Sequence, residues 1–482
     1  MRPARVAWLA YGAVAAALAA LAIGHWIWAV ALRGPVLYGE GAVAHAAILA
    51  RDRLEYTTFV GRDVAPIFIA ANYPPLYFHL AAIGDDPFVT GRIVSIAATL
   101  FVAGAIAWRA RAAGWLVASV IAVAWIGSVP VLQWGAAIKP DLVALAFTVA
   151  AVLTVERSRR GDDRVFARAF AQPGHAFAGA LIGLAAMAKP TALLPALALL
   201  VFVVRRDPLA ALRGLAAGLA AALIAGTLTH GPDKLVKIHV IDWNSLPWRL
   251  DLAAPLLLLA LIVLAVPIAT LALTRPSPTA VTAYVAGAVG VLLLGGREGA
   301  TINYVLDLSA ALALAIAGRA PALAAGMRYP VAAIAQAAVA VLLLNPFGII
   351  PGRAASTGAW GDPDRITVVG AIPGTLLVED SGLLIANGRE PLVDDVFLWS
   401  RNRARAVAGE MSFNEGQWLI DAVRRGQFDA VVTEVDLGTL DQVGGFERQR
   451  WHPDLATAVL ERYALQLSPD RRPGAVFVYT RR

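Results

Sequence analysis

The segment Tyr38-Gly39-Glu40-Gly41, with the later stretch Asn72-Tyr73-Pro74-Pro75-Leu76-Tyr77-Phe78-His79, decides how this chain is built. It follows an apolar segment that runs from about Val6 to Ala31. Proline is tolerated in the first turn of a helix and tyrosine favours a membrane boundary, so the Tyr-Pro-Pro-Leu-Tyr sequence predicts the start of an interfacial helix. An acidic residue so close to a membrane exit is also a position where a membrane enzyme can hold a catalytic base.

The composition assigns the chain to the membrane proteins. Hydrophobic residues make up 59% of the sequence, charged residues make up only 16%, and the mean hydropathy is +0.65. Water cannot be the main solvent of such a surface. The formal net charge of +7 comes with arginines that lie between apolar runs, where they set membrane orientation, so nucleic-acid binding is not expected. The absence of cysteine excludes a disulfide framework and thiolate chemistry.

The apolar segments predict a polytopic α-helical membrane domain over residues 1–348, with a first outer loop at 32–87. A spanning helix needs roughly 20 apolar residues, and this length predicts about eleven spans. The predicted spans are Val6–Ala31, Phe88–Trp108, Gly114–Leu132, Ala136–Val155, Ala176–Ala188, Thr191–Val204, Leu209–Leu228, Leu252–Leu273, Thr279–Leu294, Tyr304–Ala317 and Tyr329–Leu344.

The basic residues orient these spans, because lysine and arginine accumulate in cytoplasmic loops. With a cytoplasmic N-terminus, the following residues all fall on the cytoplasmic side: Arg2, Arg5, Arg109, Arg111, Arg157, Arg159, Arg160, Arg205, Arg206, Arg275, Arg319 and Arg328. This agreement requires the short segments on either side of Lys189 to be two spans, which places Lys189 at an outward-facing turn. We therefore expect a multi-pass protein of the plasma membrane.

The composition changes abruptly near residue 351. Strand-like runs at Thr375–Val378 and Phe428–Thr433 alternate with helical stretches at Gly416–Arg425 and Pro453–Tyr463. This alternation predicts a C-terminal extracytoplasmic α/β domain over residues 351–482, which is large enough for its own core.

Several short motifs occur along the membrane part in a defined order. They are Glu40 after the first span, the Tyr-Pro-Pro-Leu-Tyr helix start, Arg92 at the head of the second span, Lys139-Pro140-Asp141, Lys189-Pro190-Thr191 and Asn303-Tyr304. In this order they resemble the GT-C superfamily of membrane glycosyltransferases. The resemblance is to the bacterial branch related to protein mannosyltransferases, glycosyltransferase family 39, and to the lipid A aminoarabinose transferase. The C-terminal domain resembles the outer domain of many such proteins.

The resemblance implies a GT-C-like fold and a defined reaction. A hexose or pentose would pass from a polyprenyl-phosphate donor to an acceptor hydroxyl on the extracytoplasmic face, with inversion, and the acceptor would be a lipid, a glycan or a protein. The departing phosphate is already stable, so the acceptor hydroxyl needs a base more than the leaving group needs an acid. No cofactor is implied. The scattered histidines show no ligand spacing, so a divalent cation has no support, although one held by acidic groups stays open as an alternative.

Glu40 is the predicted catalytic base, since it stands at the family's acidic position after the first span. The alternative is structural, because an acid in the first turn of a helix, here about Ala42–Leu54, is favoured by the helix dipole. Glu55 and Asp63 are alternates in the same loop. Solvated pairing with the arginines of that loop is the simpler interpretation of both.

Lys189, Arg297 and Lys139 are the predicted binders of the donor phosphate. Cations near membrane depth are expensive and are kept for pairing or function. Lys139 has Asp141 near it and Arg297 has Glu298 beside it, so simple ion pairing is the alternative for both. Lys189 has no acidic residue close to it in the sequence and is the strongest of the three.

Tyr73, His79, Asp141, Asn303 and Tyr304 are the predicted substrate contacts. A single histidine on an apolar helix is more often a packing residue, which is the alternative for His79. The side chains of Asn303 and Tyr304 can equally cap the helix that they open.

Other polar residues have simpler interpretations. In the loop His230–Asp251, Trp243 and Trp248 are expected at a membrane boundary whatever the function. In the C-terminal domain, the acidic pairs Glu379-Asp380 and Asp394-Asp395 follow predicted strands and are interpreted as solvated loop acids.

Two rival functions are also compatible with this sequence. A transporter or lipid flippase would use the charged residues to line a path across the membrane, and such proteins commonly show two related halves with broken helices. A noncatalytic membrane scaffold would use the C-terminal domain to bind a partner. A cavity open to one face would favour the transferase, whereas a path to both faces would favour the transporter.

Overall fold

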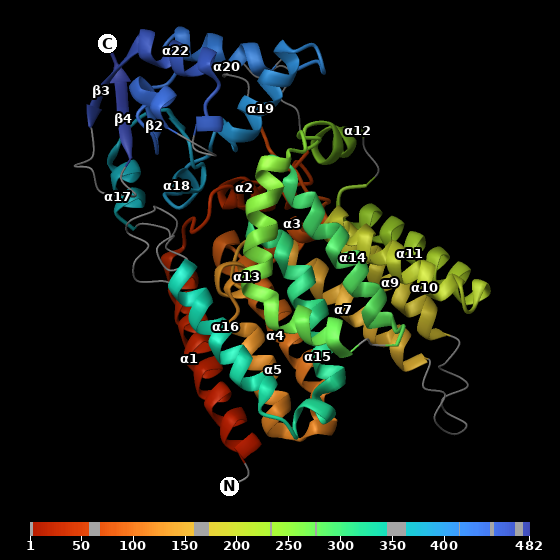
Figure 1. Ribbon diagram of the computed structural model, residues 1–482. Helices are drawn as coiled ribbons and strands as arrows, with labels where there is room; N and C mark the ends of the chain where they lie inside the picture. The colour runs from red at the N-terminus through yellow and green to blue at the C-terminus, as the bar shows by residue number, and fades with distance from the viewer. Residues whose placement is uncertain are drawn as a thin grey trace.

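The computed structural model describes residues 3–56, 68–158, 173–231, 234–274, 277–344, 363–413, 415–443, 448–467 and 476–482. Its helices form a bundle, and a smaller region with a β-sheet lies at one end of it, opposite the end where the N-terminus lies (Figure 1). Some residues with predicted positions or roles lie outside the described residues: Arg2, Asp63, Arg159, Arg160 and Arg275.

Each predicted apolar segment contains a helix of the bundle. The helices are α1 (Pro3–Leu32), α4 (Pro87–Ala110), α5 (Trp115–Ile126), α7 (Asp141–Ser158), α9 (Pro173–Ala188), α10 (Leu193–Val204), α11 (Pro208–Thr229), α13 (Leu250–Thr274), α14 (Ala280–Leu293), α15 (Leu306–Leu323) and α16 (Arg328–Leu344).

Among the described residues, 5 helical segments are long and apolar enough to cross a membrane: Pro3–Leu32, Pro87–Ala113, Pro208–Thr229, Leu250–Thr274 and Ile302–Leu323. The apolar helices agree with a membrane protein, and the number of spans stays a prediction.

Local sequence explains where two of the helices begin and end. The predicted helix Gly114–Leu132 is divided, because α5 ends at Ile126 and α6 (Val129–Trp134) begins after Ser128, whose backbone is extended. Lys189 is also extended, with φ −149° and ψ 124°, so it separates α9 from the turn η2 (Pro190–Ala192) and α10. A residue before proline avoids the helical conformation, which accounts for this break. The chain therefore reverses at Lys189, as the charge pattern predicts.

Short helical segments lie between the longer helices of the bundle. They are α2 (Glu40–Ala50), α3 (Leu76–Ala81), η1 (Arg111–Ala113), α12 (Lys234–Lys237), η3 (Ile238–Asp242), η4 (Leu294–Gly296) and η5 (Ile302–Val305). Of these, α2, α3 and α12 lie at the end of the bundle that faces the sheet (Figure 1).

The C-terminal region contains a four-stranded sheet in the order β1-β2-β4-β3. Strand β1 is parallel to β2, and β4 is antiparallel to both β2 and β3, so that Leu377 pairs with Val431 and Val431 pairs with Tyr479. The elements are α17 (Pro363–Ala371), β1 (Leu376–Val378), α18 (Gly382–Ile385), α19 (Val396–Val407), α20 (Glu415–Arg424), β2 (Ala430–Thr433), η8 (Leu437–Gln442), α22 (Pro453–Arg462), β3 (Tyr463–Leu467) and β4 (Phe477–Arg481).

The core of the C-terminal region includes residues from the loops of the bundle. Phe68 and Trp243 are buried in the same cluster as Trp399 and Phe413. The ring centroid of Phe413 lies 5.6 Å from that of Phe68 and 5.9 Å from that of Trp243. This shared packing fixes the C-terminal region against the ends of the helices and places its residues beside the first loop.

Candidate functional site

Glu40 is the first residue of α2, and the structure encloses its carboxylate completely. Its side chain is 0% exposed. Oε2 accepts hydrogen bonds from the backbone N–H of Val36 at 2.7 Å and of Leu37 at 3.3 Å, and Oε1 accepts one from the N–H of Ile138 at 2.9 Å. Gly39 suits this turn, because its φ of 76° lies in the left-handed region that favours glycine. Glu40 therefore ties the first loop to the segment before α7.

Arg92 supplies the counter-charge of Glu40. Its Nη2 lies 2.8 Å from Oε2 of Glu40, and the guanidinium also donates to the carbonyls of Ala29 and Gly34 at 2.7 and 2.6 Å. The Arg92 side chain is 0% exposed as well. The Glu40–Arg92 pair thus joins the end of α1, the start of α2 and the first part of α4.

A cavity of about 270 Å³ lies next to this pair, where the loops of the bundle meet the C-terminal region. Six of the predicted site residues line it: Tyr73, Lys139, Lys189, Arg297, Asn303 and Tyr304. They come from five separate segments of the chain, so only the tertiary fold brings them together. Glu40 does not line the cavity, although its neighbour Gly39 does.

Lys189 and Asp141 form a buried ion pair, in which Nζ of Lys189 contacts Oδ1 of Asp141. The same oxygen accepts a hydrogen bond from Nδ2 of Asn303 at 2.8 Å. The Lys189 ammonium also lies 4.8 Å from the ring centroid of Tyr304. The acid that Lys189 lacks in its local sequence is therefore supplied from the start of α7. Asp141, a predicted substrate contact, lies behind Lys189 and Asn303 and does not line the cavity.

The other two predicted cations are not held by the acids next to them in the sequence. Lys139 donates to the carbonyl of Gly39 at 2.6 Å. Arg297 donates to the backbone carbonyl and the side-chain oxygen of Asn244. Glu298 pairs with arginines elsewhere, so the alternative of simple local ion pairing is wrong for both cations.

His79 lies away from the cavity. Its Nε2 is 3.3 Å from Oε1 of Glu55, a buried carboxylate that is also 3.2 Å from Nδ1 of His230. His79, on α3, therefore packs against Glu55, as expected if it is a packing residue and does not contact substrate. The expectation that Glu55 is solvated is wrong, because its side chain is fully buried between these two histidines.

The C-terminal region contributes residues that the sequence did not indicate. Asp395, Phe397 and Leu398 line the cavity together with the loop residues. Asp394 and Asp395 are only 2% and 7% exposed, so the interpretation as solvated loop acids is wrong. Burial raises the pKa of Asp395 above its ordinary value. Their apolar neighbours Val393, Val396 and Phe397 were the only sequence signal that these acids are enclosed.

Glu379 and Asp380 are buried as well, against the same expectation. Burial and then the charge of Glu434 raise the pKa of Asp380 to about 7. Glu379 pairs with Arg450 at 3.0 Å, and the Arg450 guanidinium lies 4.3 Å from the ring centroid of Tyr38. Glu379 therefore holds Arg450 against Tyr38, which lines the cavity.

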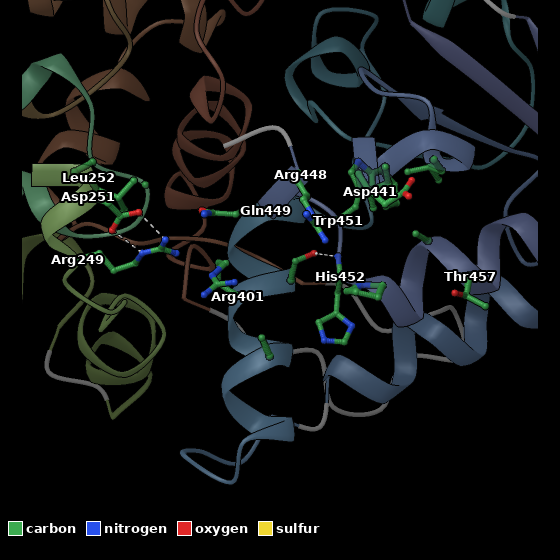
Figure 2. A pocket seen from close by; sticks show the side chains of 18 of the residues that line it. Arg249, Asp251, Leu252, Arg401, Asp441, Arg448, Gln449, Trp451, His452 and Thr457 are labelled. Atoms are coloured by element: carbon green, nitrogen blue, oxygen red, sulfur yellow. Dashed lines mark hydrogen bonds and ion pairs between the residues drawn. The ribbon is translucent and has the colours of Figure 1, made fainter. Parts of the chain in front are cut away.

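A second and larger cavity, of about 1020 Å³, lies on the other side of the segment 299–301, which lines both. Figure 2 shows Arg249, Arg401 and Gln449 directed toward one another on its wall, with His452 further along. Arg401 lies 2.6 Å from Oε2 of Glu298, and Arg249 lies 3.5 Å from Oε1 of the same residue. These ion pairs thus fix Glu298, which directly precedes the segment 299–301 that separates the two cavities.

Two further expectations concern tryptophans and metals. Trp243 packs in the core of the C-terminal region, while Trp248 is half exposed and donates its indole N–H to the carbonyl of Leu293 at 2.8 Å. Within the described ranges, no three or more His, Asp or Glu side chains come together as they would around a metal ion.

Comparisons with known proteins identify the fold. No model of a protein family and no curated protein matches the sequence. The structure is similar to ArnT from Cupriavidus metallidurans bound to undecaprenyl phosphate, with a TM-score of 0.58 and 14% identity over 96% of this chain and 97% of ArnT. The apo form of that protein gives a TM-score of 0.57 at 14% identity, over 96% of each chain.

The oligosaccharyltransferase AglB from Archaeoglobus fulgidus, in complex with an inhibitory peptide and a dolichol-phosphate, has a TM-score of 0.50 at 12% identity. That likeness covers 98% of this chain and 74% of AglB. Both proteins are GT-C members, so the chain has the GT-C fold to which its loop motifs point.

Proposed function

We propose that this protein is a membrane glycosyltransferase that moves a sugar from a polyprenyl-phosphate carrier to an acceptor hydroxyl. The GT-C fold supports this proposal, and so does the solved structure of ArnT, which holds undecaprenyl phosphate. The single observation that carries it is the convergence of Lys139, Lys189 and Arg297 on one cavity. A phosphate needs such a group of cations when it is bound at the end of an apolar bundle.

The three cations suit different parts of this task. Arg297 can engage phosphate oxygens with two parallel hydrogen bonds, whereas each lysine acts as a point charge. Lys189 is held in place by Asp141 and lies against the Tyr304 ring, so its ammonium is oriented before a donor arrives. Pre-oriented charges of this kind stabilise the negative charge that develops on a leaving phosphate.

We propose a single displacement for the reaction. The acceptor oxygen attacks the anomeric carbon, the bond from that carbon to the phosphate oxygen breaks, and its electron pair leaves with the polyprenyl phosphate. This displacement inverts the anomeric configuration. We assign the acceptor proton to a carboxylate, which can act as a general base. If Glu40 is that base, Arg92 and three backbone amides have to release it first.

We place the acceptor in the second cavity. Its wall carries hydrogen-bonding side chains, among them Arg249, Arg401, Gln449 and Thr457. The shared segment 299–301 brings its inner end next to the donor cavity. An acceptor with a polar head group, part of a lipid, a glycan or a protein, suits this lining better than an apolar one.

We further propose that both cavities and the C-terminal region face the extracytoplasmic side of the plasma membrane. Basic residues gather at the opposite end of the bundle. Arg109 there pairs with Glu156, and Arg111 and Arg157 lie 4.2 and 5.1 Å from the Trp108 ring centroid. A basic end is expected on the cytoplasmic side, where the N-terminus would also lie.

The proposal is tested with purified protein and a panel of radiolabelled polyprenyl-phosphate sugars, incubated with cell-envelope extract as the source of acceptor. We expect one donor to lose its label to an acceptor, with release of polyprenyl phosphate. The same donors in vesicles report on the rival functions. Movement of intact donor between leaflets, without cleavage of the sugar, would favour a flippase. No cleavage and no binding of any donor would refute the transferase.

A further inference from the structure

The chain around Asp395 is built into the first loop of the bundle. The N–H of Phe68 donates to the carbonyl of Leu392 at 3.0 Å, and the N–H of Asp394 donates to the carbonyl of Phe68 at 2.9 Å. The side chain of Asp394 adds a hydrogen bond from the N–H of Ala70 at 3.2 Å. These bonds fix the residues before α19 a few positions from Tyr73. The C-terminal region therefore supplies part of the donor cavity.

The carboxylates around this cavity differ in their freedom to accept a proton. Both oxygens of Glu40 are occupied by hydrogen bonds, and the side chain is 0% exposed. Asp141 is paired with Lys189 and lies behind the wall. Glu298 reaches the wall, but each of its oxygens faces an arginine. Asp395 lines the cavity and forms no ion pair with any residue in the described part of the chain.

Asp395 is also held in one orientation. Its Oδ1 accepts hydrogen bonds from the Tyr38 hydroxyl at 3.0 Å and from the N–H of Leu398 at 3.0 Å. The second bond makes Asp395 the N-cap of α19. Its other oxygen, Oδ2, receives no hydrogen bond from the described residues. One oxygen is therefore fixed by the protein while the other remains available to a ligand.

The charge of Asp395 acts on groups of the cavity. Lys139 and Tyr73, which both line the cavity, interact electrostatically with this carboxylate. Burial raises the pKa of Asp395, and the charge of Lys139 opposes this shift. A carboxylate with a raised pKa is a stronger base than an ordinary aspartate.

We propose that Asp395 is the general base of the transfer, supplied to the donor cavity by the C-terminal region. This inference rests on the proposed function. As the acceptor oxygen forms its bond to the anomeric carbon, its proton passes to Oδ2 of Asp395. The electron pair of the broken carbon–oxygen bond leaves on the polyprenyl phosphate, next to Lys189 and Arg297. Asp395 later returns the proton to water.

The test compares Asp395→Asn with Asp380→Asn in the full-length protein. Asparagine is as good an N-cap as aspartate, so Asp395→Asn keeps the bond to Leu398 and can keep the one from Tyr38 while removing the base. Asp380 is a matched control, because it is a buried aspartate that accepts from a backbone N–H at 3.0 Å and does not line the cavity. The readouts are sugar transfer, its pH profile and binding of undecaprenyl phosphate.

We expect Asp395→Asn to lower the transfer rate by about 100-fold or more, the usual contribution of a positioned base, while undecaprenyl phosphate still binds. The wild-type rate should fall as the pH drops through the raised pKa of Asp395, and this fall should be absent in the variant. Asp380→Asn should transfer at the wild-type rate. A purely structural role of Asp395 would not remove the acid side of the pH profile.

Several outcomes would overturn the assignment. If the Asp395→Asn variant transfers sugar at more than about a tenth of the wild-type rate, Asp395 is not the general base. If Asp395→Asn does not fold, Asp395→Ser, which also keeps a cap, is the second variant. Failure of both to fold would show that the charge of Asp395 is structural. A wild-type protein that cleaves no donor would instead refute the proposed function, and Asp395 with it.

Discussion

Replacing Glu40 by glutamine is expected to lower the stability of the fold, whether or not Glu40 takes part in catalysis. The Glu40 carboxylate accepts hydrogen bonds from three backbone amides and from Arg92. The side-chain nitrogen of glutamine cannot accept a hydrogen bond. In one orientation of the amide, the donors to Oε2 lose their acceptor, and in the other orientation the N–H of Ile138 loses it. Arg92 meanwhile keeps its charge in a fully buried position without a counter-ion.

The size of the effect follows from this geometry. Removing one partner of a buried ion pair costs about 3–5 kcal/mol. A buried N–H left without an acceptor costs about 1–3 kcal/mol more. The sum is a large share of the roughly 5–15 kcal/mol by which folded proteins are stable. Glu40→Gln should therefore lower the unfolding temperature in detergent by several degrees.

Thermal unfolding followed by tryptophan fluorescence measures this effect, since the chain has 13 tryptophans. Glu461→Gln is the control, because its 3.7 Å pair with Arg424 is exposed and such pairs contribute about 0–1 kcal/mol. The double variant Glu40→Gln/Arg92→Met should be more stable than Glu40→Gln alone, since it removes the unpaired charge. If Glu40→Gln unfolds at the wild-type temperature but transfers no sugar, the structural role is refuted and the catalytic role predicted from the sequence is favoured.

Three further predictions concern separate parts of the molecule. Lys189→Ala should weaken undecaprenyl phosphate binding by about tenfold or more, a loss of about 1.4 kcal/mol. Lys237→Ala, which removes an exposed pair with Asp242, should leave the affinity unchanged. Equal affinities of the two variants in a binding titration would contradict the phosphate site. The pKa of His45 is raised from 6.5, because the charge and hydrogen bond of Asp394 outweigh burial, so its contribution to stability is complete below pH 6.5 and is lost as the pH rises through the raised pKa. Unfolding temperatures measured across this range should show that loss in the wild type and not in His45→Gln. Gly41→Ala should destabilise the contact between α2 and α18 by about 1–3 kcal/mol, because its Cβ would lie 2.1 Å from the backbone nitrogen of Gly382. Gly104→Ala should be tolerated, because its added Cβ would meet no atom within 4 Å. Equal protease resistance of the two variants would refute this contact.

Much of the helical part could be predicted from the sequence, because the signals are local. The apolar segments locate the helices, and Lys189-Pro190 locates the reversal between α9 and α10. The strands β1 and β2 also lie where the alternating runs predict them. The division of α5 from α6 was missed, because a break at Gly127-Ser128 inside an apolar run leaves the hydropathy unchanged.

The candidate site was predicted less completely. The sequence identified the cations of the cavity, since a lysine or arginine beside an apolar span is unusual enough to be noticed. It could not identify their partners, which lie far away along the chain. Asp141 holds Lys189 across 48 positions, and Arg92 holds Glu40 across 52.

By itself, the sequence determined the membrane class, the positions of the helices and the three cations that line the cavity, because each depends on hydropathy or charge within a short segment. Only the tertiary structure decided which of the acids are available. Burial and hydrogen bonding enclose Glu40 between segments that are distant in the chain and bring Asp395 of the C-terminal region to the cavity wall. The reactivity of a carboxylate depends on the groups that surround it in space, and neighbours along the chain are a small part of those groups.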